Sequence, residues 1–93
     1  MVIGILHVDL RLDEACSLKD KRVVLNRLRE KVRAKFNVSI SEVDMHDIRN
    51  YACIAVVTVS NDRKHSNQVL SKVEEFMETA RGCEVEDVQF EIM

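Results

Sequence analysis

The stretch VIGILHVDLRL, residues 2–12, alternates between two kinds of side chain. One set of positions is apolar and comprises Val2, Gly4, Leu6, Val8, Leu10 and Leu12. The other set begins apolar and turns polar, in the order Ile3, Ile5, His7, Asp9 and Arg11. A period of two is typical of a β-strand with one face on the protein core. The sequence therefore predicts a first strand whose second face lies outside that core.

A helix is predicted to follow this strand. Ser17, with Asp20 three residues later, has the spacing of a capping box, in which the hydroxyl and the carboxylate accept from first-turn N–H groups. Apolar residues then recur at helical spacing and define a buried stripe of Leu18, Leu25, Leu28, Val32 and Phe36. We expect the helix to end near residues 36–37.

The remaining chain predicts two more strand regions, a second helix and a last strand. Residues 38–45 alternate with a one-residue change of phase near 41–42, which indicates a β-bulge. Residues 51–60 are almost continuously apolar, so this strand is expected to lie centrally, with Cys53 as inert packing. Asn61 and Asp62 are predicted to cap the second helix and Gly82 to end it. The last strand uses Val88, Phe90 and Ile92.

The resulting order, β-α-β-β-α-β, predicts one α+β domain over residues 1–93 of ferredoxin-like type. Right-handed crossovers place both helices on one face of a four-stranded antiparallel sheet. The chain has no proline and two glycines, which favours short connections. The opposite face of the sheet is then left uncovered by the chain.

The composition favours a protein of the cytoplasm. The three cysteines lack CxxC spacing, and free thiols are the simplest interpretation. No apolar run approaches the roughly 20 residues that a membrane span needs, and residues 1–6 do not resemble a signal peptide. No catalytic motif, cofactor-binding loop or metal-ligand spacing is evident, so we expect a protein that is not an enzyme.

The first predicted helix is unusually basic. Between residues 19 and 35 the chain has eight Lys or Arg against two acidic residues. At about 100° per residue they form two stripes beside the apolar one. One stripe is Arg22, Asn26, Arg29 and Arg33, and the other is Arg27, Lys31 and Lys35.

Two interpretations of this helix follow. Arginine and lysine stripes favour contact with phosphate groups, so the helix is a candidate surface for structured RNA, with Arg22, Arg29 and Arg33 as the main contacts. Alternatively, the helix is a solvated surface neutralised by Glu74, Glu75 and Glu78 of the second helix. The sequence pI of about 5.9 means that any attraction to RNA is local to one surface.

The uncovered sheet face is a candidate for association between protein chains. Ile3, Ile5, His7 and Asp9 are predicted to lie on it, and an uncovered apolar face generally needs a partner. We expect a homodimer through this face. The chain is poor in aromatic residues, with one tyrosine and three phenylalanines, so stacking of RNA bases on the sheet is disfavoured.

Four short motifs together resemble a known family. They are SLKDKR at residues 17–22, FNVS at 36–39, EVD at 42–44 and SND at 60–62. Their order and spacing are similar to those of the YlxP-like proteins, a small bacterial family of unknown function. The resemblance implies a ferredoxin-like fold, frequent self-association, and a gene placed beside factors of transcription and translation that include a ribosome maturation factor. It implies no activity and no catalytic residue.

Taken together, the sequence predicts a non-catalytic binding module that contacts structured RNA, ribosomal or precursor, through the basic first helix. The alternative is a protein-interaction or assembly domain that acts through its open sheet face without binding RNA.

Overall fold

The computed structural model describes all 93 residues, which form four strands and two helices. Along the chain these are β1 (Val2–Arg11), α1 (Leu18–Lys35), β2 (Ser39–Asp44), β3 (Tyr51–Ser60), α2 (Arg63–Glu78) and β4 (Glu84–Ile92). The element order is the predicted one. Neither helix is both long and apolar enough to cross a membrane.

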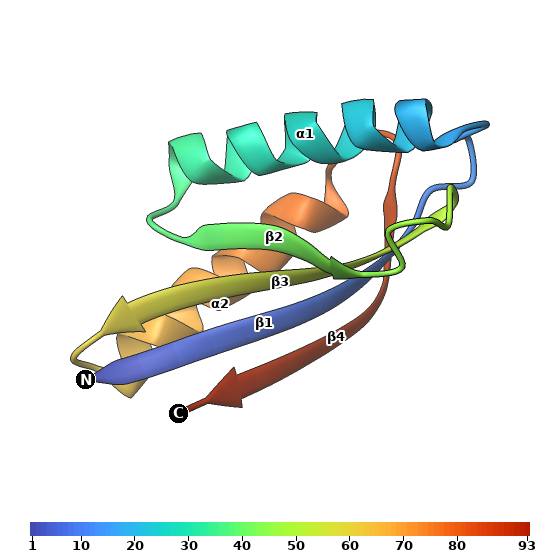
Figure 1. Ribbon diagram of the computed structural model, residues 1–93. Helices are drawn as coiled ribbons and strands as arrows, with labels where there is room; N and C mark the ends of the chain where they lie inside the picture. Colours follow the sequence, from blue (N-terminus) through green and yellow to red (C-terminus); the bar gives the residue numbers. More distant parts are fainter.

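The strands make one antiparallel sheet in the order β2-β3-β1-β4. Both helices pack on one face of this sheet, and the other face is bare (Figure 1). This confirms the predicted ferredoxin-like fold. The chain ends lie side by side, because the N–H of Ile3 donates to the carbonyl of Met93 at 3.1 Å.

The core lies between the sheet and the helices. Leu6, Val8 and Leu10 of β1 are at most 1% exposed and pack with the buried residues of β3, α1 and α2. The alternation predicted for residues 2–12 is therefore confirmed. Gly4 allows α2 to lie close to β1, since a Cβ at this position would be 3.0 Å from the Leu70 Cδ1 atom.

The predicted capping box opens α1. The Ser17 hydroxyl accepts from the N–H of Asp20 at 3.1 Å, and the Asp20 carboxylate accepts from the N–H of Cys16 at 3.0 Å. The first bond satisfies one of the N–H groups that a helix start leaves without partners, and the second holds the residue before the N-cap. The helix ends at Lys35 with Phe36 as its C-cap, as predicted.

Three details differ from the sequence predictions. The bulge of β2 lies between Glu42 and Asp44, slightly later than predicted. Helix α2 ends at Glu78 with Thr79 as its C-cap, so Gly82 does not end it. Instead, Gly82 has a φ of 86° in the turn before β4, which favours glycine because other residues are strained there. Strand β4 begins at Glu84, ahead of the apolar residues that predicted it.

Candidate functional site

Helix α1 has one buried stripe and a wide exposed surface. The buried stripe is Lys21, Leu25, Leu28 and Val32, so one of the eight basic residues belongs to the core side. Of the predicted contact residues, Arg29 is half-buried, and the others are exposed: Arg22, Asn26, Arg27, Lys31, Arg33 and Lys35. Lys19 is also exposed.

The exposed cations of α1 have no carboxylate partner. The ion pairs of the structure are His7–Glu91, Arg11–Asp13, Arg11–Glu84 and Lys21–Glu42. Seven of the eight Lys and Arg residues of α1 therefore form no ion pair, and the salt bridges to Glu74, Glu75 and Glu78 considered above are absent. The positive charge of α1 is available to an external anion.

The flank of α1 beside β2 carries Arg22, Asn26 and Arg29. These residues, with Leu25 and Glu42, line a hollow of about 220 Å³. An Arg29 guanidinium nitrogen lies 3.5 Å from the Asn26 side-chain oxygen, while its Nε atom is buried without an acceptor. The Glu42 carboxylate of this hollow is already paired with the buried Lys21 ammonium group.

The flank of α1 beside α2 is more strongly positive. Arg27 and Lys31 line a second hollow of about 220 Å³ together with Arg81, and none of its lining residues is acidic. Lys35 continues the flank, with its Nζ atom 5.0 Å from the centre of the Phe76 ring. Sequence analysis missed Arg81 because it lies outside both helices.

The turn at Gly82 brings Arg81 to α1. A Cβ on Gly82 would lie 3.2 Å from the Val24 Cγ2 atom and 3.8 Å from an Arg27 guanidinium nitrogen. A side chain at this position would require the Val24 side chain to shift by a few tenths of an ångström, so glycine allows the turn to lie this close to the helix. No local sequence signal marks this juxtaposition, since residues 27 and 81 are distant in the chain.

Lys21 is a structural residue and cannot contact an external anion. Its side chain is 2% exposed, and its Nζ atom donates to the carbonyls of Met45 and Ile48, both at 2.7 Å. The Glu42 carboxylate lies 2.8 Å from the same nitrogen. Two hydrogen bonds to carbonyls and one ion pair thus compensate the burial of the ammonium group.

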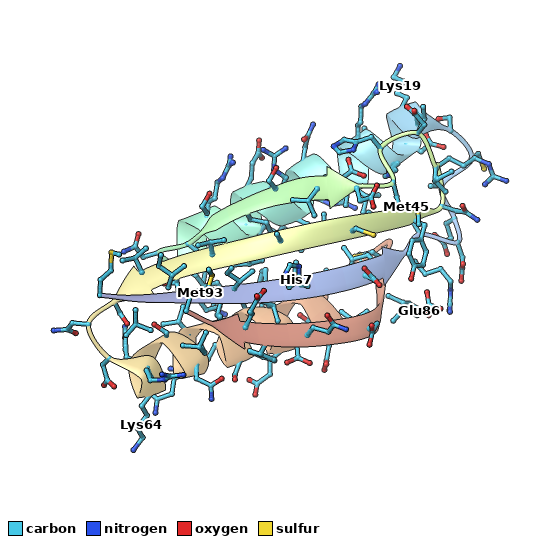
Figure 2. All side chains as sticks on the ribbon, turned by 60° about the horizontal axis from the view of Figure 1, so that its bottom comes forward. His7, Lys19, Met45, Lys64, Glu86 and Met93 are labelled. Atoms are coloured by element: carbon cyan, nitrogen blue, oxygen red, sulfur yellow. The ribbon has the colours of Figure 1, made fainter.

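The open sheet face holds the four residues predicted for association between chains. Ile3, Ile5, His7 and Asp9 all point away from the helices, as the alternation predicted. Figure 2 looks onto this face, with His7 near its middle. The His7 Nε2 atom lies 3.2 Å from a carboxylate oxygen of Glu91 on β4.

Cys53 lies half-buried on this open face, so its predicted place in the core packing is wrong. Cys53 of β3 lies opposite Asp9 of β1 on one side and opposite Asp44 of β2 on the other. Burial, followed by the hydrogen bond and negative charge of Asp9, raises the pKa of the Cys53 thiol to about 11. All three cysteines are free thiols, as expected.

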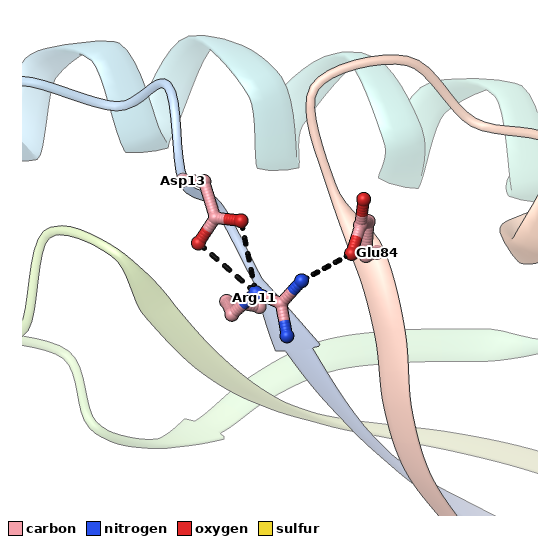
Figure 3. A network of polar contacts seen from close by, with 3 residues as sticks. All are labelled: Arg11, Asp13 and Glu84. Carbon is pink, nitrogen blue, oxygen red and sulfur yellow. Dashed lines mark hydrogen bonds and ion pairs between the residues drawn. The ribbon is translucent and has the colours of Figure 1, made fainter.

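Arg11 is fixed at the end of β1 by two carboxylates (Figure 3). Its Nε atom donates to both oxygens of Asp13, at 2.9 and 3.0 Å, and a terminal nitrogen donates to Glu84. The hydrogen bond to Asp13 and the charges of Asp13 and Glu84 raise the pKa of Arg11. The charge of Arg11 is therefore balanced by these carboxylates.

No group of three or more His, Cys, Asp or Glu residues is arranged to hold a metal ion.

Comparison with known proteins identifies the family. The model of a family described as "Protein of unknown function (DUF503)" matches residues 3–90. The chain belongs to this family. A relative, the uncharacterized protein YlxP of Bacillus subtilis (strain 168), is 35% identical over 78 residues, which cover 84% of this chain and 85% of YlxP. The predicted resemblance to the YlxP-like proteins is thus confirmed.

Solved structures support the fold of this DUF503 chain. The ACT domain of a GTP pyrophosphokinase from Chlorobium tepidum is similar with a TM-score of 0.56 and 14% identity, covering 96% of each chain. A de novo designed protein with ferredoxin fold, LFR1 1, has a TM-score of 0.55 and 12% identity, covering 100% of this chain and 84% of its own. At these identities the likeness shows the fold alone.

Proposed function

We propose that this DUF503 protein is a non-catalytic binding module that contacts structured RNA, ribosomal or precursor, through α1. The observation that supports the proposal is the set of seven unpaired Lys and Arg side chains on one helix. Unpaired cations on an otherwise acidic protein concentrate attraction for phosphate on one surface. The helix has 18 residues and is about 27 Å long, enough to face several successive phosphates.

Binding is expected to depend on backbone charge and shape. The open sheet face has Tyr51 as its one aromatic side chain, so it lacks the platform on which single-stranded bases stack. Arginine forks onto phosphate oxygens without reading the base. Structured RNA, which displays ordered phosphates, therefore fits better than an unfolded strand.

Within α1, the flank beside α2 is the stronger candidate for the main contact. Arg27, Lys31 and Arg81 converge on a hollow with no acidic lining residue, whereas the other flank includes Glu42. We therefore place the main phosphate contact on these three residues. Arg22, Arg29 and Arg33 support it from the second flank.

The test is RNA binding by the purified protein over a salt series. Wild-type protein is titrated with ribosomal subunits and with a structured ribosomal RNA fragment, from about 50 to 200 mM salt. The logarithm of the association constant should fall linearly with the logarithm of salt, with a slope of about 0.7–0.9 per phosphate contact. The variant Arg27→Glu/Lys31→Glu/Arg81→Glu should bind at least about 30-fold more weakly, because three contacts become repulsive.

A matched control separates local contact from overall charge. Arg63→Glu/Lys64→Glu/Lys72→Glu makes the same change in net charge on α2, where all three residues are exposed. This control should change binding by less than about threefold. Equal losses in both variants, or no wild-type binding at low salt, would refute RNA contact through α1.

A further inference from the structure

The open sheet face has two unlike halves. Near the chain ends it is mainly apolar, with Ile3 paired to Val59 and Ile5 paired to Val57. Glu91 of β4 also lies beside Ile5 there, with a carboxylate oxygen 3.2 Å from the His7 Nε2 atom. Val59 is 61% exposed and Met93, beside Ile3, is 67% exposed. Large apolar side chains this exposed and this close together mark a surface for association.

The other half of the face is acidic. The strand registers place Asp44, Cys53, Asp9 and Asp87 in one row across all four strands. Three of these four side chains are carboxylates, and no ion pair neutralises any of them. Beside this row, burial and the charges of Asp9 and Glu86 raise the pKa of Tyr51, as expected in a negative field.

A second copy of the chain matches this face poorly. Two sheets packed face to face are related by a two-fold axis that lies between them. An axis along the strands sets the aspartate row of one copy against that of the other, and like charges placed opposite repel. An axis across the strands sets each aspartate row against the apolar half. Neither of these two aligned orientations satisfies both halves of the face.

We propose that the open sheet face binds an amphipathic helix of a partner protein that is apolar at one end of its contact side and rich in Lys and Arg at the other. The apolar end covers Ile3, Ile5 and Val59, and the basic end lies over Asp9, Asp44 and Asp87. The nine residues from Ile3 to Arg11 span about 26 Å along β1. A helix of about 18 residues has the same length.

This site is separate from the RNA surface. The acidic row lies on the face of the sheet opposite α1, so RNA that approaches the basic helix does not reach it (Figures 1 and 2). The negative charge of the row also repels phosphate. Helix binding at the open sheet face therefore does not depend on RNA binding at α1.

The test uses a synthetic helical peptide of 18 residues. Its contact side carries leucine in one half and lysine in the other, and its fluorescence anisotropy reports binding to the full-length protein. The control peptide has glutamate in place of every lysine. We expect the lysine peptide to bind at least about tenfold more tightly than the glutamate peptide, because opposite charges meet across the interface. In NMR spectra it should shift amide signals of β1 and β3 and leave those of α1 in place.

Matched protein variants test the two halves of the face. Asp9→Asn/Asp44→Asn/Asp87→Asn should weaken peptide binding at least about tenfold, while Glu74→Gln/Glu75→Gln/Glu78→Gln, which removes three acids from α2, should change it less than about twofold. Val59→Ser should weaken binding, whereas Val23→Ser, which alters a valine of similar exposure on α1, should not. The aspartates and Val59 are accessible side chains, and circular dichroism checks that each variant is folded.

Three results would overturn the proposal. The first is that the lysine and glutamate peptides bind equally well. The second is that the two sets of acid-to-amide changes weaken peptide binding equally. The third is that the wild-type protein sediments as a homodimer and that Val59→Ser dissociates it. The last result would show that a second copy occupies the face.

Discussion

At the scale of single residues, Cys53 reports the electrostatics of the open sheet face. Its thiol lies between Asp9 and Asp44 in the strand registers, so a thiolate there would meet two negative neighbours. Burial disfavours the charged form as well, and together these causes raise the pKa to about 11 from an ordinary 9.0. Cys53 is thus a poor nucleophile in spite of its position outside the core.

Alkylation of Cys53 should therefore be slow at pH 8 and gain rate up to about pH 11. Since the thiolate reacts, a rise of about two pKa units lowers the rate at pH 8 about 100-fold relative to an ordinary thiol. Asp9→Asn should lower the pKa of Cys53 and speed the reaction. After burial, the Asp9 carboxylate is the largest cause of the raised pKa, and this change removes its charge. Mass spectrometry of iodoacetamide-treated protein resolves Cys53 from the other two cysteines. A rate midpoint near pH 9 in the wild-type protein would contradict this account.

At the scale of elements, Lys21 joins α1 to the turn between β2 and β3. Met45, which has a φ of 63°, and Ile48 offer their carbonyls to its Nζ atom, and Glu42 offers its carboxylate. Arg49 adds a second link by donating to the carbonyl of Ala15 at 3.0 Å. A turn without regular structure is thereby held against the start of the helix.

Lys21→Met should destabilise the protein by about 3 kcal/mol, because it leaves a largely buried carboxylate and two carbonyls without their donor. Urea unfolding followed by circular dichroism measures this loss. Adding Glu42→Gln should restore part of the stability, since the unpaired charge is then removed. A loss of less than about 1 kcal/mol in the free energy of unfolding would show that Lys21 is dispensable. The control is Lys19→Met, which alters an exposed lysine of the same helix and should change the free energy of unfolding by about zero.

At the scale of the whole molecule, charge is divided between two opposite sides. The first 46 residues hold nine Lys or Arg against seven acids, and the rest hold five against nine. The two surfaces do not simply follow this difference along the chain, because Asp9 and Asp44 of the acidic row come from the first half and Arg81 comes from the second. Helix α1 presents unpaired cations on one side, and the aspartate row lies on the other.

The two proposed surfaces should therefore bind at the same time and be separable by mutation. Arg27→Glu/Lys31→Glu/Arg81→Glu should lose the RNA and keep the lysine peptide, and Asp9→Asn/Asp44→Asn/Asp87→Asn should do the reverse. Sedimentation of protein mixed with labelled RNA and labelled peptide should show both labels in one complex. Competition between the two ligands would place them on a shared surface and contradict this division.

The sequence by itself determined the element order, the core face of β1 and the capping of α1. Each of these depends on residues within one strand or one helix. There the apolar residues recur with a period of two or of 3.6, which can be read directly from the sequence. For that reason the fold, the open face carrying Ile3, Ile5, His7 and Asp9, and the exposed cations of α1 were predictable.

Only the tertiary structure decided which distant residues meet. Lys21 sits within a basic run, yet its position on the buried stripe and the carbonyls of the 45–48 turn make it a core residue. Arg81 joins Arg27 because a glycine turn packs against α1. Asp44 and Asp87 join Asp9 through the strand registers and the bulges within them. These juxtapositions depend on register and on the packing of separate elements, and neither leaves a periodic signal in the sequence.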